Sequence, residues 1–259
     1  MRKCDREVNM KQNNYNQNES NYIIGRNAVT EALKAGNPIN QIFVTSMSGS
    51  LGAICNLAKK QGIPVKTADV RKLDTMSNGG NHQGVCAEAA CAEYASVADI
   101  LAVSEKKGTK PFLILCDGIE DPHNLGAIIR TAEAAGADGV ILPKRRSASL
   151  TQTVFKTSAG AASWLPVARV SNLATEMIAL KKLGLWFYGA DMNGSPATQT
   201  DLKGAIGLVI GSEGFGLSEP VKAQCDAIIS LPMFGKVNSL NASVAAGILM
   251  YEAVRQRND

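Results

Sequence analysis

The amino-acid sequence predicts an α/β protein with two domains, and three observations support this fold class. Strand-like apolar runs alternate with helix-like segments along most of the 259 residues. The run "PFLILCDGI" (111–119) is an apolar strand of the kind found in parallel sheets that are covered on both faces. The alternation is interrupted once, at residues 92–110, by a segment that ends in Lys, Gly and Thr.

The smaller domain is expected at residues 21–91. Helices are predicted at 25–36, 51–62 and 71–77, and strands at 41–45, 64–68 and 84–90. Residues 92–110 contain one short amphipathic helix, and we expect them to link the domains.

The larger domain is expected at residues 111–259. Strands are predicted at 111–119, 138–143, 165–170, 185–191, 205–211 and 227–233. Helices are predicted at 124–136, 149–162, 172–184 and 218–225, with a last helix through Val244, Ile248, Tyr251 and Val254. This alternation predicts a parallel sheet with helices on both faces.

Composition favours a folded protein of the cytoplasm. The chain is 45% hydrophobic, yet no apolar run reaches the roughly 18 residues that a membrane span needs. Residues 1–20 are charged and rich in Asn and Gln, which predicts a disordered tail rather than a signal peptide. The net charge of +4 permits an anionic partner without requiring one.

The cysteines are predicted to be reduced, and most of them are predicted to pack against other apolar side chains. They lack the CxxC spacing of zinc or redox sites, and with only two histidines in the chain we expect no bound metal. The six are Cys4, Cys55, Cys86, Cys91, Cys116 and Cys225.

Three apolar strands of the larger domain run into polar turns that contain glycine and precede helices. They are "LCDGIEDPHNLGAIIR", "LVIGSEGFGLSEP" and "ISLPMFGKVNSLNASVAAG". Ligands of open parallel sheets bind beyond the carboxyl ends of the strands, so these turns are predicted to wall one pocket. The turns match neither a P-loop nor the GxGxxG motif of dinucleotide-binding proteins. The third turn carries more polar residues than helix capping requires, namely Lys236, Asn238, Ser239, Asn241 and Ser243.

Several polar residues allow two interpretations. By position alone, Asn124 is a helix cap and Arg130, six positions later, is a solvated charge; the resemblance named below implies instead a site residue and a catalytic group. Glu213 lies between glycines, where it is either a carboxylate at a helix N-terminus or part of the pocket. The cluster Lys144, Arg145 and Arg146 is either a solvated charge cluster or a contact for RNA phosphates.

The three turns resemble, in order and spacing, the three motifs of the SpoU (TrmH-type) RNA ribose 2′-O-methyltransferases. The resemblance rests on "DPHNLGAIIRTAEAAGADGVIL", "LVIGSEGFGLS" and "LPMFGKVNSLNASVAAGILMYEAVRQR". The smaller domain, with "IIGRNAVTEAL" and "NHQGVCAE", resembles the ribosomal-protein-like RNA-binding domain of RlmB-type 23S rRNA methyltransferases.

The resemblance implies a SPOUT-type parallel sheet with a deep trefoil knot, and a homodimer. It further implies an enzyme that transfers a methyl group from S-adenosylmethionine to the ribose 2′-hydroxyl of a nucleotide in structured RNA, with a guanosine of 23S rRNA expected. The alternatives are a tRNA 2′-O-methyltransferase and a noncatalytic RNA-binding factor of ribosome assembly.

The resemblance also implies roles for single residues. The implied catalytic residues are Arg130, Asn124, Glu213, Ser239 and Asn241. The implied cofactor-binding residues are Gly211, Leu231, Leu240, Ala190, Ile210 and Met233. Arg26, with His82 and Gln83, is implied near the RNA-facing side of the smaller domain. Because a guanidinium stays charged at neutral pH, we expect Arg130 to orient the 2′-hydroxyl with a substrate phosphate rather than to act as a base.

Overall fold

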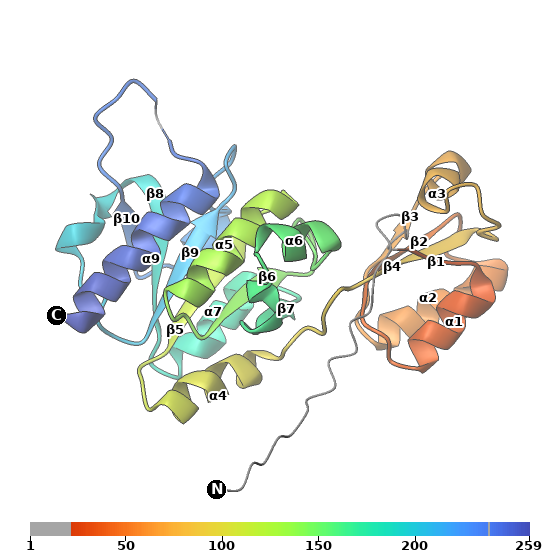
Figure 1. Cartoon of the computed structure of the whole chain (residues 1–259), viewed down its shortest axis with the longest axis horizontal. Coiled ribbons are helices and arrows are strands. Elements are labelled where there is room, and N and C mark those ends of the chain that lie inside the picture. The colour runs from red at the N-terminus through yellow and green to blue at the C-terminus, as the bar shows by residue number, and fades with distance from the viewer. Residues whose placement is uncertain (1–21, 238) are drawn as a thin grey trace, which may run out of the picture.

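The computed structural model describes residues 22–237 and 239–259, which form two α/β units (Figure 1). The predicted tail at residues 1–20, Cys4 and Asn238 lie outside the described residues. Among the helices of the described ranges, none has both the length and the apolar composition needed to cross a membrane.

The N-terminal unit contains a four-stranded sheet in the order β1–β4–β2–β3. Its strands are β1 (Tyr22–Ile24), β2 (Ile39–Val44), β3 (Val65–Thr67) and β4 (Val85–Ala89). Its helices are α1 (Arg26–Lys34), α2 (Gly52–Lys60) and α3 (Val70–Met76), with the short turn η1 (Gly49–Leu51). Helices α1 and α2 cover one face, and α3 packs through Leu73 on the other. The sheet is mixed, because β2 and β3 are parallel whereas β4 is antiparallel to both β1 and β2.

The C-terminal unit contains a six-stranded sheet in the order β10–β8–β9–β5–β6–β7, and every pairing in it is parallel. This confirms the parallel sheet predicted from the sequence. The strands are β5 (Phe112–Asp117), β6 (Gly139–Pro143), β7 (Val167–Val170), β8 (Trp186–Pro196), β9 (Ile206–Gly211) and β10 (Ala227–Ser230).

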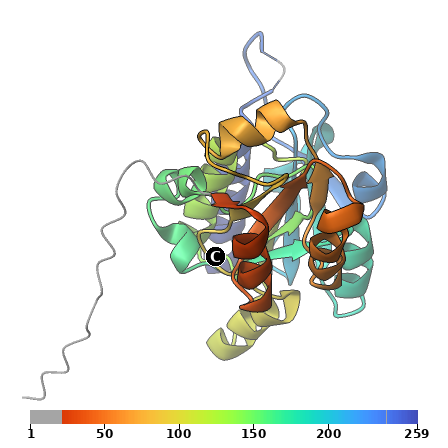
Figure 2. The same cartoon turned by 90° about the vertical axis from the view of Figure 1, so that its right-hand side faces the viewer.

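Helices cover both faces of this sheet. The helices are α4 (Val97–Lys107), α5 (Pro122–Ala134), α6 (Gln152–Thr157), α7 (Leu173–Lys181), α8 (Glu219–Lys222) and α9 (Ala242–Asn258), with the short turns η2 (Ala161–Ser163) and η3 (Ala197–Gln199). Helices α5, α6 and α9 share one core with the sheet, while α4, α7 and α8 share the core on the opposite face (Figures 1 and 2).

Helix α4 lies within the segment 92–110 that the sequence predicts as a linker. It begins with a capping box, in which Ser96 and Asp99 satisfy each other's backbone N–H groups. Its Ile100 is fully buried in one of the two cores, directly over Gly139 of β6. This part of the segment therefore covers the C-terminal sheet as well as connecting the two units.

The face of α9 that packs against the core differs from the apolar repeat that predicted the helix. The repeat that predicted the helix includes Val244, Ile248 and Tyr251, which are 50, 45 and 51% exposed. The buried face consists of Ala242, Ala246, Leu249, Met250, Ala253 and Gln256. The small alanines allow the helix to approach its neighbours closely, and Leu249 and Met250 fill the core beside them.

The two units meet at a junction built from β2, β7 and the start of the connecting segment. Asn40 of β2 is fully buried, and its side-chain oxygen accepts a hydrogen bond from the Tyr94 hydroxyl at 2.8 Å. Arg169 of β7 donates to the carbonyl oxygens of Asn40 at 3.0 Å and Lys144 at 2.9 Å. Its guanidinium lies 4.9 Å from the centre of the Tyr94 ring. These contacts hold the two units together.

Candidate active site

The turn after β9 is a tight loop that depends on glycine. Ser212 and Gly216 exchange two backbone hydrogen bonds, of 3.0 and 2.9 Å, which close the loop around Glu213. A Cβ atom at Gly211 would overlap the backbone of Gly216, so only glycine allows the chain to pass itself this closely. The backbone N–H of Ser218 donates to Asp117 at 2.7 Å, which ties this turn to the end of β5.

Asn124 is placed by the start of α5. Asp121 caps this helix by accepting a hydrogen bond from the His123 backbone at 3.0 Å, and Pro122 occupies the first helical position. Asn124 therefore lies in the first turn, where its side-chain amide donates to Oε1 of Glu213 at 2.9 Å. Asn124 is not the helix cap, which was one of its two interpretations.

Asn241 caps α9 and reaches into the same cluster. Its side-chain oxygen accepts hydrogen bonds from the backbone N–H groups of Ser243 at 3.0 Å and Val244 at 3.2 Å, and from the Ser243 hydroxyl at 2.6 Å. Its amide nitrogen donates to Oδ1 of Asn124 at 2.9 Å and also to Oε1 of Glu213. One side chain thus serves both the helix and the cluster.

Glu213 is the centre of this polar cluster. Its Oε1 accepts from the side-chain amides of Asn124 and Asn241, and from the backbone N–H of Ala242 at 3.4 Å. Its Oε2 accepts no hydrogen bond from the residues that the structure describes, and the side chain is exposed to solvent. The cluster therefore presents one carboxylate oxygen that is available to a ligand.

A cavity of about 410 Å³ lies next to the cluster, at the carboxyl ends of β8, β9 and β10. It is lined by all six residues that were expected to bind the cofactor: Ala190, Ile210, Gly211, Leu231, Met233 and Leu240. Glu213 and Ser239 line it too. Of the three turns that were predicted to wall one pocket, those after β9 and β10 do so, whereas the turn after β5 joins only through Asn124.

Strand β8 supplies cavity residues that the sequence analysis missed. Asp191 and Asn193 line the cavity, because β8 continues five residues beyond its predicted end at residue 191. The Lys222 ammonium donates a hydrogen bond of 2.8 Å to Asp191 and lowers the pKa of that carboxyl, which is therefore ionised at neutral pH. No sequence motif pointed to Asp191.

Arg130 does not join the polar cluster. It is exposed on α5, six positions after Asn124, which places it about 9 Å further along the helix axis and on another side of the helix. The neighbouring Thr131 packs against Gly247 of α9. Of the five expected catalytic residues, the structure therefore brings Asn124, Glu213 and Asn241 into contact and leaves Arg130 apart.

The residues expected to bind RNA lie on two surfaces. Lys144 follows β6 at the junction, where its side chain reaches Gly62 of the N-terminal unit, and Arg145 and Arg146 beside it are exposed. On the N-terminal unit, the Arg26 side chain donates to the backbone carbonyl of Gln83 at 2.9 Å, and the Arg26 backbone N–H donates to the side-chain oxygen of Gln83 at 3.1 Å.

His82 and His123 have structural contacts. The His82 ring lies 3.1 Å from Asp74 and accepts a hydrogen bond from the backbone N–H of Gly84 at 3.0 Å, so it shapes a loop. His123 lies 3.4 Å from the Thr157 hydroxyl.

The described cysteines are free thiols. Burial raises the pKa of Cys116 to about 12 and is the main cause that raises the pKa of Cys225 to about 11, so both are protonated at neutral pH. Within residues 22–237 and 239–259, no three His, Cys, Asp or Glu side chains are grouped closely enough to hold a metal ion.

Comparison with known proteins identifies both units. Residues 111–251 match the SpoU rRNA Methylase family, and residues 22–95 match the family described as "RNA 2'-O ribose methyltransferase substrate binding". A Bacillus subtilis protein named "Putative TrmH family tRNA/rRNA methyltransferase YacO" is 46% identical over 243 residues, covering 93% of this chain and 97% of its own.

Two solved structures are similar over both units. The SpoU methyltransferase AviRb from Streptomyces viridochromogenes, in complex with AdoMet, aligns with a TM-score of 0.59 and 25% identity, covering 92% of this chain and 90% of its own. An AdoMet-bound rRNA methyltransferase from Sinorhizobium meliloti aligns with a TM-score of 0.55 and 25% identity, covering 90% of this chain and 86% of its own.

Proposed function

Because the chain belongs to the SpoU rRNA Methylase family of S-adenosylmethionine-dependent RNA methyltransferases, we propose that it methylates the ribose 2′-hydroxyl of a guanosine in 23S rRNA. The observation that carries this proposal is the polar cluster of Asn124, Glu213 and Asn241 at the edge of the cavity. The cluster offers a carboxylate oxygen to a hydroxyl group, next to a space in which a methyl donor fits.

The cavity suits S-adenosylmethionine in size and lining. Its volume of about 410 Å³ lies in the usual range for small-molecule sites, and it combines apolar side chains with a few polar groups. Ile210, Leu231 and Leu240 would pack against the adenine, and Gly211 lets the backbone approach the ligand. Ala190 and Met233 complete the proposed contacts. When bound, the cofactor supplies a methyl group activated by a positively charged sulfur.

The polar cluster would orient and deprotonate the ribose hydroxyl. The 2′-oxygen forms a bond to the methyl carbon while the bond from that carbon to sulfur breaks, and the hydroxyl proton must leave. We assign this proton to Oε2 of Glu213, because Asn124 and Asn241 already hold Oε1. Ser239, exposed on the cavity wall, is proposed to bind the same nucleotide. Holding the hydroxyl in line with the sulfur–methyl bond supplies much of the acceleration.

Arg130 is proposed to bind the phosphate beside the target ribose. A guanidinium stays protonated at neutral pH and can hold two phosphate oxygens at once. We therefore expect Arg130→Lys to lower kcat/KM for RNA at least about tenfold, since a lysine cannot form the paired contact. Arg255→Lys, on the exposed C-terminal end of α9, is the matched control and should keep full activity. An Arg130→Lys enzyme with most of its activity would contradict this role.

The choice of 23S rRNA rests on the N-terminal unit. The Sinorhizobium meliloti rRNA methyltransferase aligns with 90% of this chain, so the likeness includes both units. The Bacillus subtilis relative is named for both tRNA and rRNA, and tRNA is therefore the second candidate substrate. The proposed contacts for RNA phosphates are Lys144, Arg145, Arg146 and Arg26.

We also propose that the protein forms a homodimer, that its C-terminal unit contains a trefoil knot, and that it is located in the cytoplasm. The exposed Val244, Ile248 and Tyr251 form an apolar stripe on α9, which supports a contact with a second copy of the chain. Light scattering of the protein and of an Ile248→Asp variant tests this, and a monomeric wild-type protein would contradict it.

The experiment that tests the proposed substrate is a map of ribose methylation across cellular RNA. RNA is compared from cells with the gene, without it, and with the gene restored as wild type or as the Arg130→Ala variant. We expect one guanosine of 23S rRNA to lose its methyl group and to regain it only with the wild-type gene. Loss confined to tRNA would replace the rRNA assignment, and an unchanged map would overturn the proposal.

A further inference from the structure

An aromatic side chain stands fully exposed at the mouth of the cavity. Phe215 is 98% exposed, although it is one of the residues that line the cavity. It lies only two positions after Glu213, within the same tight turn. Large apolar side chains are seldom left in water at such a position, so the exposed ring indicates a binding partner.

The turn holds this ring in a defined place. The backbone N–H of Phe215 donates to the hydroxyl of Ser212 at 3.3 Å, inside the loop that the Ser212–Gly216 pair closes. The next residue, Gly216, has a φ of 65°, a conformation that favours glycine. The backbone that carries the ring is therefore preorganised, and the ring itself is free to meet a flat ligand.

A second exposed aromatic ring lies in the turn after β10, next in sequence to a residue that lines the cavity. Phe234, in the long loop that rises from the sheet between β10 and α9 (Figure 1), is 96% exposed. It directly follows Met233, which lines the cavity, and the only charged residue between β10 and α9 is the cation Lys236. The two turns that wall the cavity thus carry two exposed aromatic rings and a cation, and such groups bind single-stranded RNA, with bases stacked on the rings and phosphates near the cation.

We propose that Phe215 stacks on an unpaired nucleobase of the RNA substrate, at or next to the nucleotide that is methylated. The inference rests on the proposed function, because it requires that a ribose reach Glu213. It specifies the substrate further: the target must lie in a loop, bulge or single strand, since a base within a duplex has both faces covered. Stacking of this kind tolerates any base, so Phe215 recognises an unpaired state rather than a sequence.

The test uses the full-length protein, saturating S-adenosylmethionine and a short single-stranded RNA that contains 2-aminopurine, whose fluorescence falls when the base stacks. The variants are Phe215→Ala, Phe215→Leu and Phe215→Trp. We expect wild type and Phe215→Trp to quench the fluorescence, and the Ala and Leu variants to quench less and bind the RNA about 5- to 100-fold more weakly. The control is Trp164→Ala, which removes an 82% exposed ring from the opposite, amino-terminal edge of the sheet. It should change neither the quenching nor the affinity for RNA.

Each other outcome overturns the inference. If Phe215→Leu binds as well as Phe215→Trp, the ring does not act by stacking. A loss of cofactor affinity, measured by calorimetry, would place the ring against the cofactor, and a change of oligomeric state would place it against a second copy of the chain. Absence of quenching by wild type, or an equal effect of Trp164→Ala, also contradicts it. These measurements do not depend on the methylation map, so the inference and the proposed substrate fail separately.

Discussion

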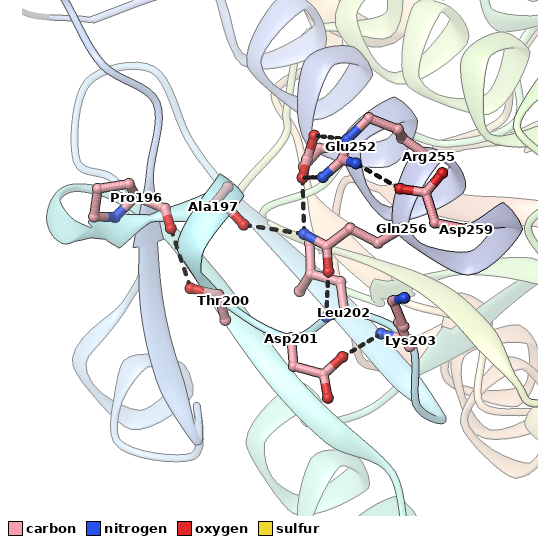
Figure 3. Close-up of polar contacts among 10 residues, drawn as sticks. All are labelled: Pro196, Ala197, Thr200, Asp201, Leu202, Lys203, Glu252, Arg255, Gln256 and Asp259. Carbon is pink, nitrogen blue, oxygen red and sulfur yellow. Dashed lines mark hydrogen bonds and ion pairs between the residues drawn. The ribbon is translucent and has the colours of Figure 1, made fainter.

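The two ends of α9 carry polar networks of opposite character. At the N-terminal end, Asn241 joins Asn124 and Glu213 in a cluster that is open to solvent. At the C-terminal end, Gln256 is 7% exposed and ties the helix to the connection between β8 and β9 (Figure 3). The first network adjoins a cavity, and the second is closed within the chain.

The difference lies in which hydrogen-bonding groups are used. The Gln256 amide nitrogen donates to the Ala197 carbonyl at 3.3 Å and to Glu252 at 2.8 Å, and its oxygen accepts from the backbone N–H of Leu202 at 2.9 Å (Figure 3). Each of its groups is satisfied, as buried polar groups require. Glu213 keeps one oxygen without a partner among the described residues. A complete network stabilises the fold, whereas an incomplete one at a cavity is suited to a ligand.

The largest expected effect is on the open network. Glu213→Gln replaces the proposed proton acceptor with a neutral amide of the same size and should lower kcat at least about 100-fold. The unfolding free energy should change little, because the side chain is exposed. Single-turnover methylation of RNA measures the effect. The control is Glu219→Gln, which removes an exposed carboxylate from α8 and should leave kcat unchanged.

Breaking the closed network should lower the stability of the protein and leave its activity largely intact. Gln256→Leu keeps the approximate volume but leaves the N–H of Leu202 without its hydrogen-bond partner, which should lower the unfolding free energy by about 1–3 kcal/mol. Urea denaturation measures this loss, and methylation at low temperature should persist. The matched control is Gln199→Leu on η3, where the side chain is exposed. Equal stability of the two variants would contradict the role given to Gln256.

The smallest expected effect is a pH dependence of stability that arises from Glu252 in the closed network. Hydrogen bonds from Arg255, and then from Gln256, lower the pKa of Glu252 (Figure 3). The folded protein therefore binds this proton more weakly than the unfolded chain does. The resulting stabilisation is complete above the unfolded pKa of about 4.3 and is lost as the pH falls through the lower folded value.

Arg255→Gln tests this dependence. It removes the strongest cause of the shift, so the fall in melting temperature below about pH 4 should become less steep than in wild type. Because Arg255 is 55% exposed, water screens the pair, and its contribution to stability at neutral pH should be small. Differential scanning calorimetry across this pH range measures the difference, and parallel pH profiles would show that the pair has no such effect.

The sequence predicted the elements with strong local signals and missed those that depend on neighbours. The three-residue strand β1 was missed because so short a run has no periodicity, and it is held by pairing with β4. The last five residues of β8, "MNGSP", were missed because they are polar and pair with β10 only where the register shifts. Helix α4 was predicted, but its burial under the sheet was not, since an amphipathic pattern does not identify what covers its apolar face.

The candidate site was predicted in part for the same reason. The resemblance to the family motifs implied that Asn124, Glu213 and Asn241 belong to one site. Glu213 lies 89 positions from Asn124 and 28 from Asn241, and its contact with Asn124 depends on β9 lying directly beside β5. Asp191 lies in none of the three motifs, and Phe215 lies in the second motif but was given no role, so that only their places on the cavity wall single them out.

The sequence by itself determined the α/β class, the parallel sheet and the family, because alternation, glycine-containing turns and motif residues are properties of short segments. Only the tertiary structure decided that residues 117 positions apart share a hydrogen bond, that Arg130 lies outside their cluster, and that the apolar stripe of α9 faces solvent. The physical reason is that strand order and helix orientation follow from packing the whole chain at once. Local patterns restrict that packing without fixing which segments become neighbours.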